Sequence, residues 1–184
     1  MSGMGGARTA RAAAGAALLA FAVLAGCGGA DTPEHASRRA PRHCVVREGR
    51  PDPRCTPGAT VSAVTQVSIH RTICRRAWVR SAPRLPAARL AALEGSQLRA
   101  YGFYAGHGPA AYVEDVLIPA ALGGRATDPR NLWPQARAPA PAAAQKDELE
   151  RTLHRAVCTG ATTLAAAQRT LARDWSAAYL ETTG

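Results

Sequence analysis

The sequence lacks the features of several common protein classes. It has five cysteines but no Cys-x-x-Cys pair, which argues against a zinc ribbon or a thioredoxin-like redox centre. The apolar run over residues 12–23 has 12 residues, too few to span a bilayer, which takes about 20. Only one of the 23 basic residues, Lys146, is a lysine. This arginine bias indicates a drift in composition rather than a recognition motif.

The N-terminal residues have the pattern of an export signal. Arg8 and Arg11 precede the apolar run, and Leu24-Ala25-Gly26 places small residues before Cys27. A basic region, a short apolar region and small residues at the cleavage site are typical of a secretory signal. The step into Cys27 is similar to a lipoprotein signal, so we expect lipidation of Cys27. The acyl chains would hold the protein on the outer face of the cell membrane. The alternative is an ordinary signal peptide that happens to contain a cysteine.

The chain divides into three expected parts: a signal over residues 1–26, a flexible tether over 27–50 and one folded domain over 51–184. The tether is expected because residues 28–50 are rich in Gly, Pro, Arg and Ala and have no apolar periodicity. Removing the signal takes Arg8 and Arg11 from a net charge of +10, which leaves about +8. A basic surface suits nucleic acid or anionic lipid headgroups, and is equally compatible with a solvated surface. No protein partner can be inferred.

Four cysteines remain after Cys27: Cys44, Cys55, Cys74 and Cys158. In an exported chain, this number implies two disulfides, which can be paired in three ways. We favour Cys44–Cys55, which closes a short loop, and Cys74–Cys158, which ties the start of the domain to a late helix.

The stretch 112–134 predicts a hairpin. Residues 112–119 form a short apolar segment that carries Glu114 and Asp115, typical of a strand. Gly123-Gly124 and Asp128-Pro129 are turn signals. Residues 131–134, Asn-Leu-Trp-Pro, then return the chain. A hairpin of this kind brings an acid and an asparagine close to each other.

Helices are predicted on either side of this hairpin, so the fold class is α+β. Residues 87–100 are good helix formers, and residues 143–158 place Leu149, Leu153, Ala156 and Val157 on one face. Another face of the predicted helix over residues 143–158 carries Asp147, Glu150 and His154. At a rotation of 100° per residue, these three lie within about 60° of each other around the helix axis. A last helix is expected from Thr162 or Thr163 to about residue 179. Residues 61–73 predict a strand or an irregular edge.

Several segments, in order, resemble a group of actinobacterial secreted proteins with an HNH-type (ββα-metal) nuclease core. The segments that carry the resemblance are Pro51–Ala59, Thr72–Cys74, Glu114–Gly124, Asn131–Pro134 and Lys146–Glu150. The resemblance spans residues 51–181 and implies a small hairpin-plus-helix core with additional packed helices. The largest departure is Val116, which stands where the family has its histidine. Ala120 and Ala121 replace a Leu-Glu pair.

The resemblance implies a role for each matching position. The family's histidine is the general base, so the base position here is Val116. Asp115 matches the acid that binds a divalent metal, Mg²⁺ or Mn²⁺, and Asn131 matches the residue that orients the histidine. Asp147, Glu150 and His154 are the further candidate metal ligands on the helix.

Because valine cannot accept a proton, we expect a degenerate, non-catalytic domain with a binding or structural role at the cell surface. The alternative is an active, divergent, metal-dependent endonuclease that acts on extracellular nucleic acid. His107 would then be one candidate to replace the missing base.

Overall fold

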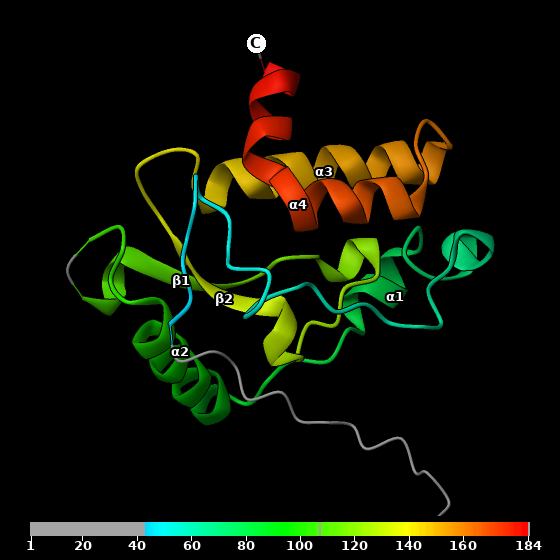
Figure 1. The fold of residues 1–184 in the computed structure, drawn as a ribbon. Coiled ribbons are helices and arrows are strands. Elements are labelled where there is room, and N and C mark those ends of the chain that lie inside the picture. Colours follow the sequence, from blue (N-terminus) through cyan, green and yellow to red (C-terminus); the bar gives the residue numbers. More distant parts are fainter. Residues whose placement is uncertain (1–42, 107, 184) are drawn as a thin grey trace, which may run out of the picture. The chain divides into compact units, whose positions relative to one another are not determined.

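The computed structural model describes residues 43–106 and 108–183 (Figure 1). Cys27, the expected signal and His107 lie outside these residues. The described part is an α+β arrangement with a small two-stranded sheet. The sheet is a hairpin of β1 (Tyr112–Val116) and β2 (Leu132–Ala136), as the sequence predicts. In Figure 1, α2 (Ala87–Tyr101) lies below the hairpin, whereas α3 (Ala143–Thr159) and α4 (Leu164–Thr183) lie above it.

The strands pair antiparallel, from Tyr112 opposite Ala136 to Val116 opposite Leu132. Asp115 is opposite Trp133, and Glu114 is opposite Pro134. Successive side chains of a strand point to opposite faces of the sheet, so these two neighbouring acids face different surroundings. β1 is shorter than the segment 112–119 expected from the sequence. Beyond Val116, the chain turns into a 3₁₀ helix, Ala120–Leu122.

The two long helices pack against each other and contribute half of the buried residues of the main core. α3 contributes Leu149 and Val157, both 2% exposed or less, from the predicted apolar face. α4 contributes the apolar stripe Leu164, Ala167, Leu171 and Trp175, each 4% exposed or less. The backbone of α4 is non-helical at Asp174, whose carboxylate accepts a hydrogen bond from the Ala177 amide. This bond caps the last turns after the kink.

A second apolar cluster lies between α2 and β2. It contains Cys44, Tyr101 and Trp133, with Tyr104 packed beside them. The Tyr104 and Trp133 rings are nearly parallel, with centroids 6.4 Å apart. The hairpin is therefore packed on both sides, which explains why every residue of β2 is buried.

The segment between the first disulfide and α2 differs from the expectation. Residues 61–73 form no strand; a 3₁₀ helix, Gln66–Arg71, lies there instead, followed by the short helix α1 (Arg76–Arg80). The Ser68 hydroxyl donates to the Ala63 carbonyl, and the Thr65 amide donates to the Ser68 hydroxyl. Serine and threonine offer the backbone such local partners in place of a strand ladder.

Two disulfides, Cys44–Cys55 and Cys74–Cys158, link the chain with the favoured pairing. Disulfides of this kind are compatible with an exported protein. The first one corrects the boundary of the expected tether: Cys44 is buried, and Arg50 donates to the Arg173 carbonyl at 3.0 Å. Residues 43–50 thus belong to the folded domain, because a disulfide and long-range hydrogen bonds fix them.

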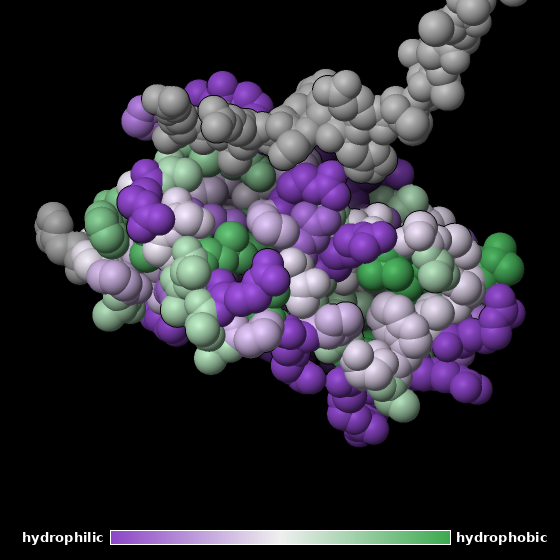
Figure 2. All heavy atoms as spheres, turned by 90° about the horizontal axis from the view of Figure 1, so that it is seen from below, coloured by the Kyte–Doolittle hydropathy of each residue, from purple (hydrophilic) through white to green (hydrophobic). Residues whose placement is uncertain are grey.

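The surface is polar and mixed. Figure 2 shows one face on which apolar residues form separate areas among strongly hydrophilic ones. None of the helices within residues 43–106 and 108–183 is both long and apolar enough to cross a lipid bilayer.

Candidate functional site

The candidate site lies where the end of β1 meets the first turns of α3. Helix α3 begins at Ala143, and the Ala142 amide donates to the Gln145 side chain at 3.1 Å. This contact fixes the start of the helix and directs Lys146 toward β1. Asp115 comes from the penultimate position of β1, and Glu150 lies one helical turn after Lys146.

Lys146 is the centre of this site, and its side chain is completely buried. Its ammonium donates to Asp115 Oδ2 at 2.9 Å, to the Val116 carbonyl at 2.5 Å and to Glu150 Oε1. An ammonium has three hydrogens, so these three oxygens satisfy it completely. A buried charge without such partners would be strongly destabilising. The three contacts tie the end of β1 to α3.

The charges at this site are strongly coupled. Burial favours the neutral amine, but attraction to Asp115 and Glu150 outweighs it and raises the pKa of Lys146. Burial raises the pKa of Glu150 to about 7, against the opposing effect of Lys146. One ammonium shared by two carboxylates leaves one excess negative charge. Near neutral pH, Glu150 therefore takes up a proton readily.

Val116 offers only its backbone to the site. Its side chain is part-buried and has no proton-accepting atom, while its carbonyl oxygen accepts from Lys146. The position that the resemblance assigns to a general base thus holds an isopropyl group beside a buried ion pair.

Asn131 is fully buried, and all of its side-chain hydrogen bonds are to backbone atoms. Its Oδ1 accepts from the Ile118 amide at 3.0 Å, and its Nδ2 donates to the carbonyls of Ile118 at 2.8 Å and Arg125 at 3.1 Å. Asn131 therefore acts as an internal clamp on the segment that connects β1 to β2.

The Gly-Gly step in this connection has two distinct structural requirements. Gly123 has a φ of 77°, in the left-handed region that glycine adopts without strain. A Cβ on Gly124 would lie 1.7 Å from the Ile118 carbonyl oxygen, which no side chain could tolerate. The first glycine allows the turn, and the second allows the close approach of two backbones.

The remaining candidate metal ligands lie apart from Asp115 and Glu150. The Asp147 side chain is exposed. His154 Nε2 lies 3.0 Å from the Ile73 carbonyl and 3.5 Å from Cys158 Sγ, so this ring packs beside the second disulfide. Over the described ranges, no three or more His, Cys, Asp or Glu side chains are grouped so as to hold a metal ion. Because the Lys146 ammonium already occupies an oxygen of both Asp115 and Glu150, this donor set does not fit a divalent cation as arranged.

The structure also identifies buried polar groups that sequence reasoning did not single out. Both oxygens of Glu114, the amide of Gln135 and the indole Nε1 of Trp133 are buried without a hydrogen-bond partner among the described residues. Burial raises the pKa of Glu114 to about 8, helped by the charges of Glu94 and Asp115. The sequence shows two adjacent acids in a short apolar strand, which does not indicate which of them has its carboxylate buried.

The sequence did carry a signal for Lys146. Residues 146, 149, 153 and 157 lie at helical spacing, and Leu149 and Val157 are in the core. The only lysine of the chain therefore lies on the apolar stripe of α3, where a solvated cation would not be expected.

Comparisons with protein-family models, with curated proteins and with solved structures found no match.

Proposed function

We propose that the chain is an exported protein with an HNH-like, catalytically degenerate domain, held on the outer face of the membrane by a lipid on Cys27. Its role there is binding or structural. The two disulfides support export. The hairpin followed by a helix, with Asp115, Asn131 and Gly123-Gly124 at the motif positions, supports the HNH-like core.

The observation that carries the non-catalytic part of the proposal is the end of β1. Val116 provides no proton acceptor, and the adjacent Asp115 is bound to the Lys146 ammonium. A positioned general base contributes about 10²–10⁴-fold to a rate. Without one, attack of water on a phosphodiester loses that contribution. A structural role for the ion pair follows from the same contacts, since it joins the hairpin to α3.

The alternative is a divergent, metal-dependent endonuclease. It is favoured by one specific feature: two carboxylates, those of Asp115 and Glu150, do meet at the hairpin–helix junction. In that case, the bound metal would have to use ligands in addition to Asp115, and a different group would have to accept the proton.

Cleavage of supercoiled plasmid DNA by the purified, oxidised full chain tests the proposal. We compare the wild type, Val116→His, and Val116→Leu as a matched control that adds no proton acceptor. Each protein is assayed with Mg²⁺, with Mn²⁺ and with chelator, after circular dichroism has shown that it is folded. We expect no metal-dependent cleavage by the wild type or by Val116→Leu. The HNH-like interpretation predicts that Val116→His cleaves at least about tenfold faster than the wild type.

Each result has a clear consequence. Metal-dependent cleavage by the wild type would refute the non-catalytic proposal in favour of the endonuclease. A folded Val116→His protein without any gain would remove the support for an HNH-like site, and would leave a binding or structural domain of another origin. Intact-mass analysis of membrane-extracted protein tests the lipid anchor, which an unmodified Cys27 thiol would rule out.

A further inference from the structure

A cleft of about 650 Å³ lies outside the candidate site. One wall follows α1 and includes Trp78 and Pro83, and the other is the connection between β1 and β2, with Arg125 and Arg130. None of Asp115, Val116, Lys146 or Glu150 lines it. Its volume falls within the range of about 300–1,000 Å³ that is typical of sites for small organic ligands.

The cleft has apolar walls and two guanidinium groups that differ in their partners. Arg130 is bound through two hydrogen bonds to Asp128, at 3.1 Å and 2.9 Å, which lowers the pKa of that carboxyl. Arg125 donates from Nε to the Thr60 carbonyl at 2.9 Å, and no ion pair involves it within the described residues. The terminal nitrogens of Arg125 are thus available for an anion, and its Nε bond restricts the orientation of the group.

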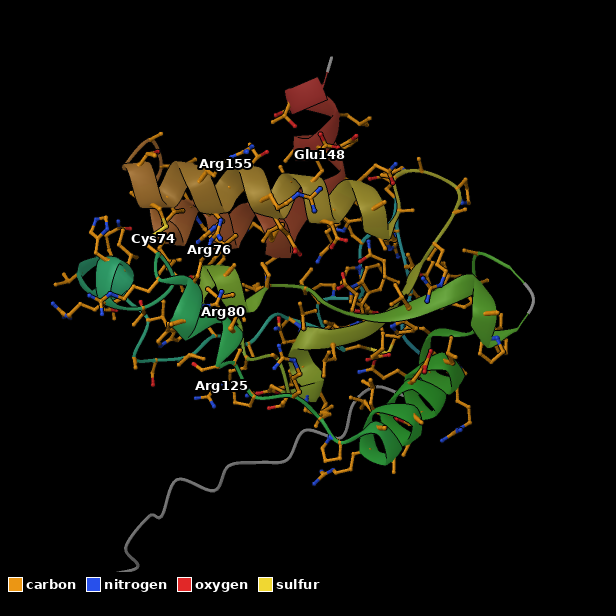
Figure 3. All side chains as sticks on the ribbon, turned by 180° about the vertical axis from the view of Figure 1, so that it is seen from behind. Cys74, Arg76, Arg80, Arg125, Glu148 and Arg155 are labelled. Atoms are coloured by element: carbon orange, nitrogen blue, oxygen red, sulfur yellow. A yellow bond between two sulfur atoms is a disulfide. The ribbon has the colours of Figure 1, made fainter. Side chains whose placement is uncertain are left out.

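Three charged side chains line the cleft, those of Arg125, Arg130 and Asp128, and together they carry one net positive charge. Residues 53–93 contain seven arginines and no aspartate or glutamate. Figure 3 shows Arg76 and Arg80 on α1 and Arg125 on the connection between the strands, on the same side of the view. Basic groups around a cleft attract anions and raise their local concentration.

The walls are fixed before any ligand binds. The Asn131 clamp holds the Arg125 carbonyl, and Gly124 packs its backbone directly on Ile118. On the other wall, Trp78 packs against the main core. A preformed site loses little conformational entropy on binding, which favours a specific ligand over loose adsorption.

We infer that this cleft binds a small amphipathic anion, with its oxyanion head (a phosphate or a carboxylate) on Arg125 and its apolar body against Trp78. A guanidinium fork matches the geometry of both kinds of head, through charge-assisted hydrogen bonds. The apolar wall explains why a free inorganic ion is not the preferred ligand. This inference does not depend on the proposed nuclease-like origin of the domain.

Isothermal titration of the full chain with 1-naphthyl phosphate and with 1-naphthoate tests the inference. We expect saturable one-to-one binding of at least one compound, and at least about tenfold weaker binding of inorganic phosphate and of 1-naphthol. Arg125→Gln should weaken the binding at least about tenfold because it removes the charge. Ala82→Leu should also weaken it, by filling the cleft without changing any charge. Arg155→Gln on α3 is the matched control and should bind as the wild type does.

The inference is overturned if neither compound binds saturably, or if Arg125→Gln binds as tightly as the wild type. It is also overturned if Arg155→Gln weakens binding as much as Arg125→Gln does, since attraction to net positive charge would then suffice. Trp78 is not substituted because it also packs against the core. Loss of binding in a Trp78 variant could then result either from a lost ligand contact or from altered packing.

Discussion

Glu114 provides a sharp test of the structure, because its carboxylate is held in the protein interior without a partner. It lies in the middle of β1 opposite Pro134, a residue with no amide hydrogen to donate. Both carboxylate oxygens are buried and unbonded in the described part of the chain. The nearest charges that affect it, those of Glu94 and Asp115, are also negative. The surroundings therefore favour the neutral, protonated acid.

The sign and the size of the effect follow from the pKa of this group. Burial raises the pKa of Glu114 from its usual 4.5 to about 8. Below pH 4.5, the group is neutral in both the folded and the unfolded chain. Between pH 4.5 and 8, the unfolded chain releases the proton while the folded chain keeps it, so stability falls as the pH rises. At about 1.4 kcal/mol per pH unit, the whole interval corresponds to about 5 kcal/mol as an upper limit.

We expect the substitution Glu114→Gln to abolish this loss, because the amide does not ionise. Relative to the wild type, the free energy of unfolding of the variant should increase by about 3 kcal/mol between pH 5 and pH 8. Urea denaturation of the oxidised protein at pH 5, 6, 7 and 8 measures it. Comparing two proteins at each pH removes the contribution of Glu150, which titrates in the same range.

Glu181→Gln, at an exposed position near the end of α4, is the control and should show no such trend. If the difference between Glu114→Gln and the wild type stays constant from pH 5 to pH 8, the carboxylate is not buried as described. The packing of the hairpin against α2 would then need to be revised.

Two further predictions concern the links that hold α3 in place. Lys146→Met should lower the free energy of unfolding by about 3–5 kcal/mol at pH 8, because it leaves the two part-buried carboxylates of Asp115 and Glu150 without a cation. The loss in urea denaturation should be clearly smaller at pH 4, and an equal loss at both pH values would indicate lost packing instead. Replacing Cys74 and Cys158 by serine should cost about 4–5 kcal/mol, whereas replacing Cys44 and Cys55 should cost about 3 kcal/mol, since the longer loop restricts the unfolded chain more. The reverse order in urea denaturation of the two double variants would contradict this reasoning.

The helices and the hairpin could be predicted because their signals are local and repeated. In α4, apolar residues recur every three or four positions from Leu164 to Trp175, and all of them are buried. In α3, Gly160 adopts a φ of 80° just after the helix, as a C-terminal glycine should. Such patterns depend on the spacing of residues within one helix or strand and not on the segments that pack against it.

The parts that could not be predicted depend on contacts between distant segments. Residues 43–50 have the composition of a tether, but a disulfide and the contact of Arg50 with α4 fix them on the domain. The weak alternation over residues 61–73 suggested a strand, yet no strand of the described part of the chain pairs with it, and local Ser and Thr bonds favour a 3₁₀ helix. Two of the three partners of Lys146, the Asp115 carboxylate and the Val116 carbonyl, come from a strand about thirty residues earlier, so the sequence showed only the position of Lys146 on the apolar stripe.

The contacts that determine the path of the chain near the end of β1 do not involve the side chain of Val116. Asn131 and Gly124 determine the path of the connection between the strands, and their contacts are with backbone atoms. A substitution at either residue would remove a buried hydrogen bond or create a clash. Val116, by contrast, contributes its carbonyl to Lys146, and any residue at that position supplies the same carbonyl. The identity of the side chain at this position is therefore independent of this contact. A fold does not by itself determine an activity, so the activity of this chain has to be argued from the site itself.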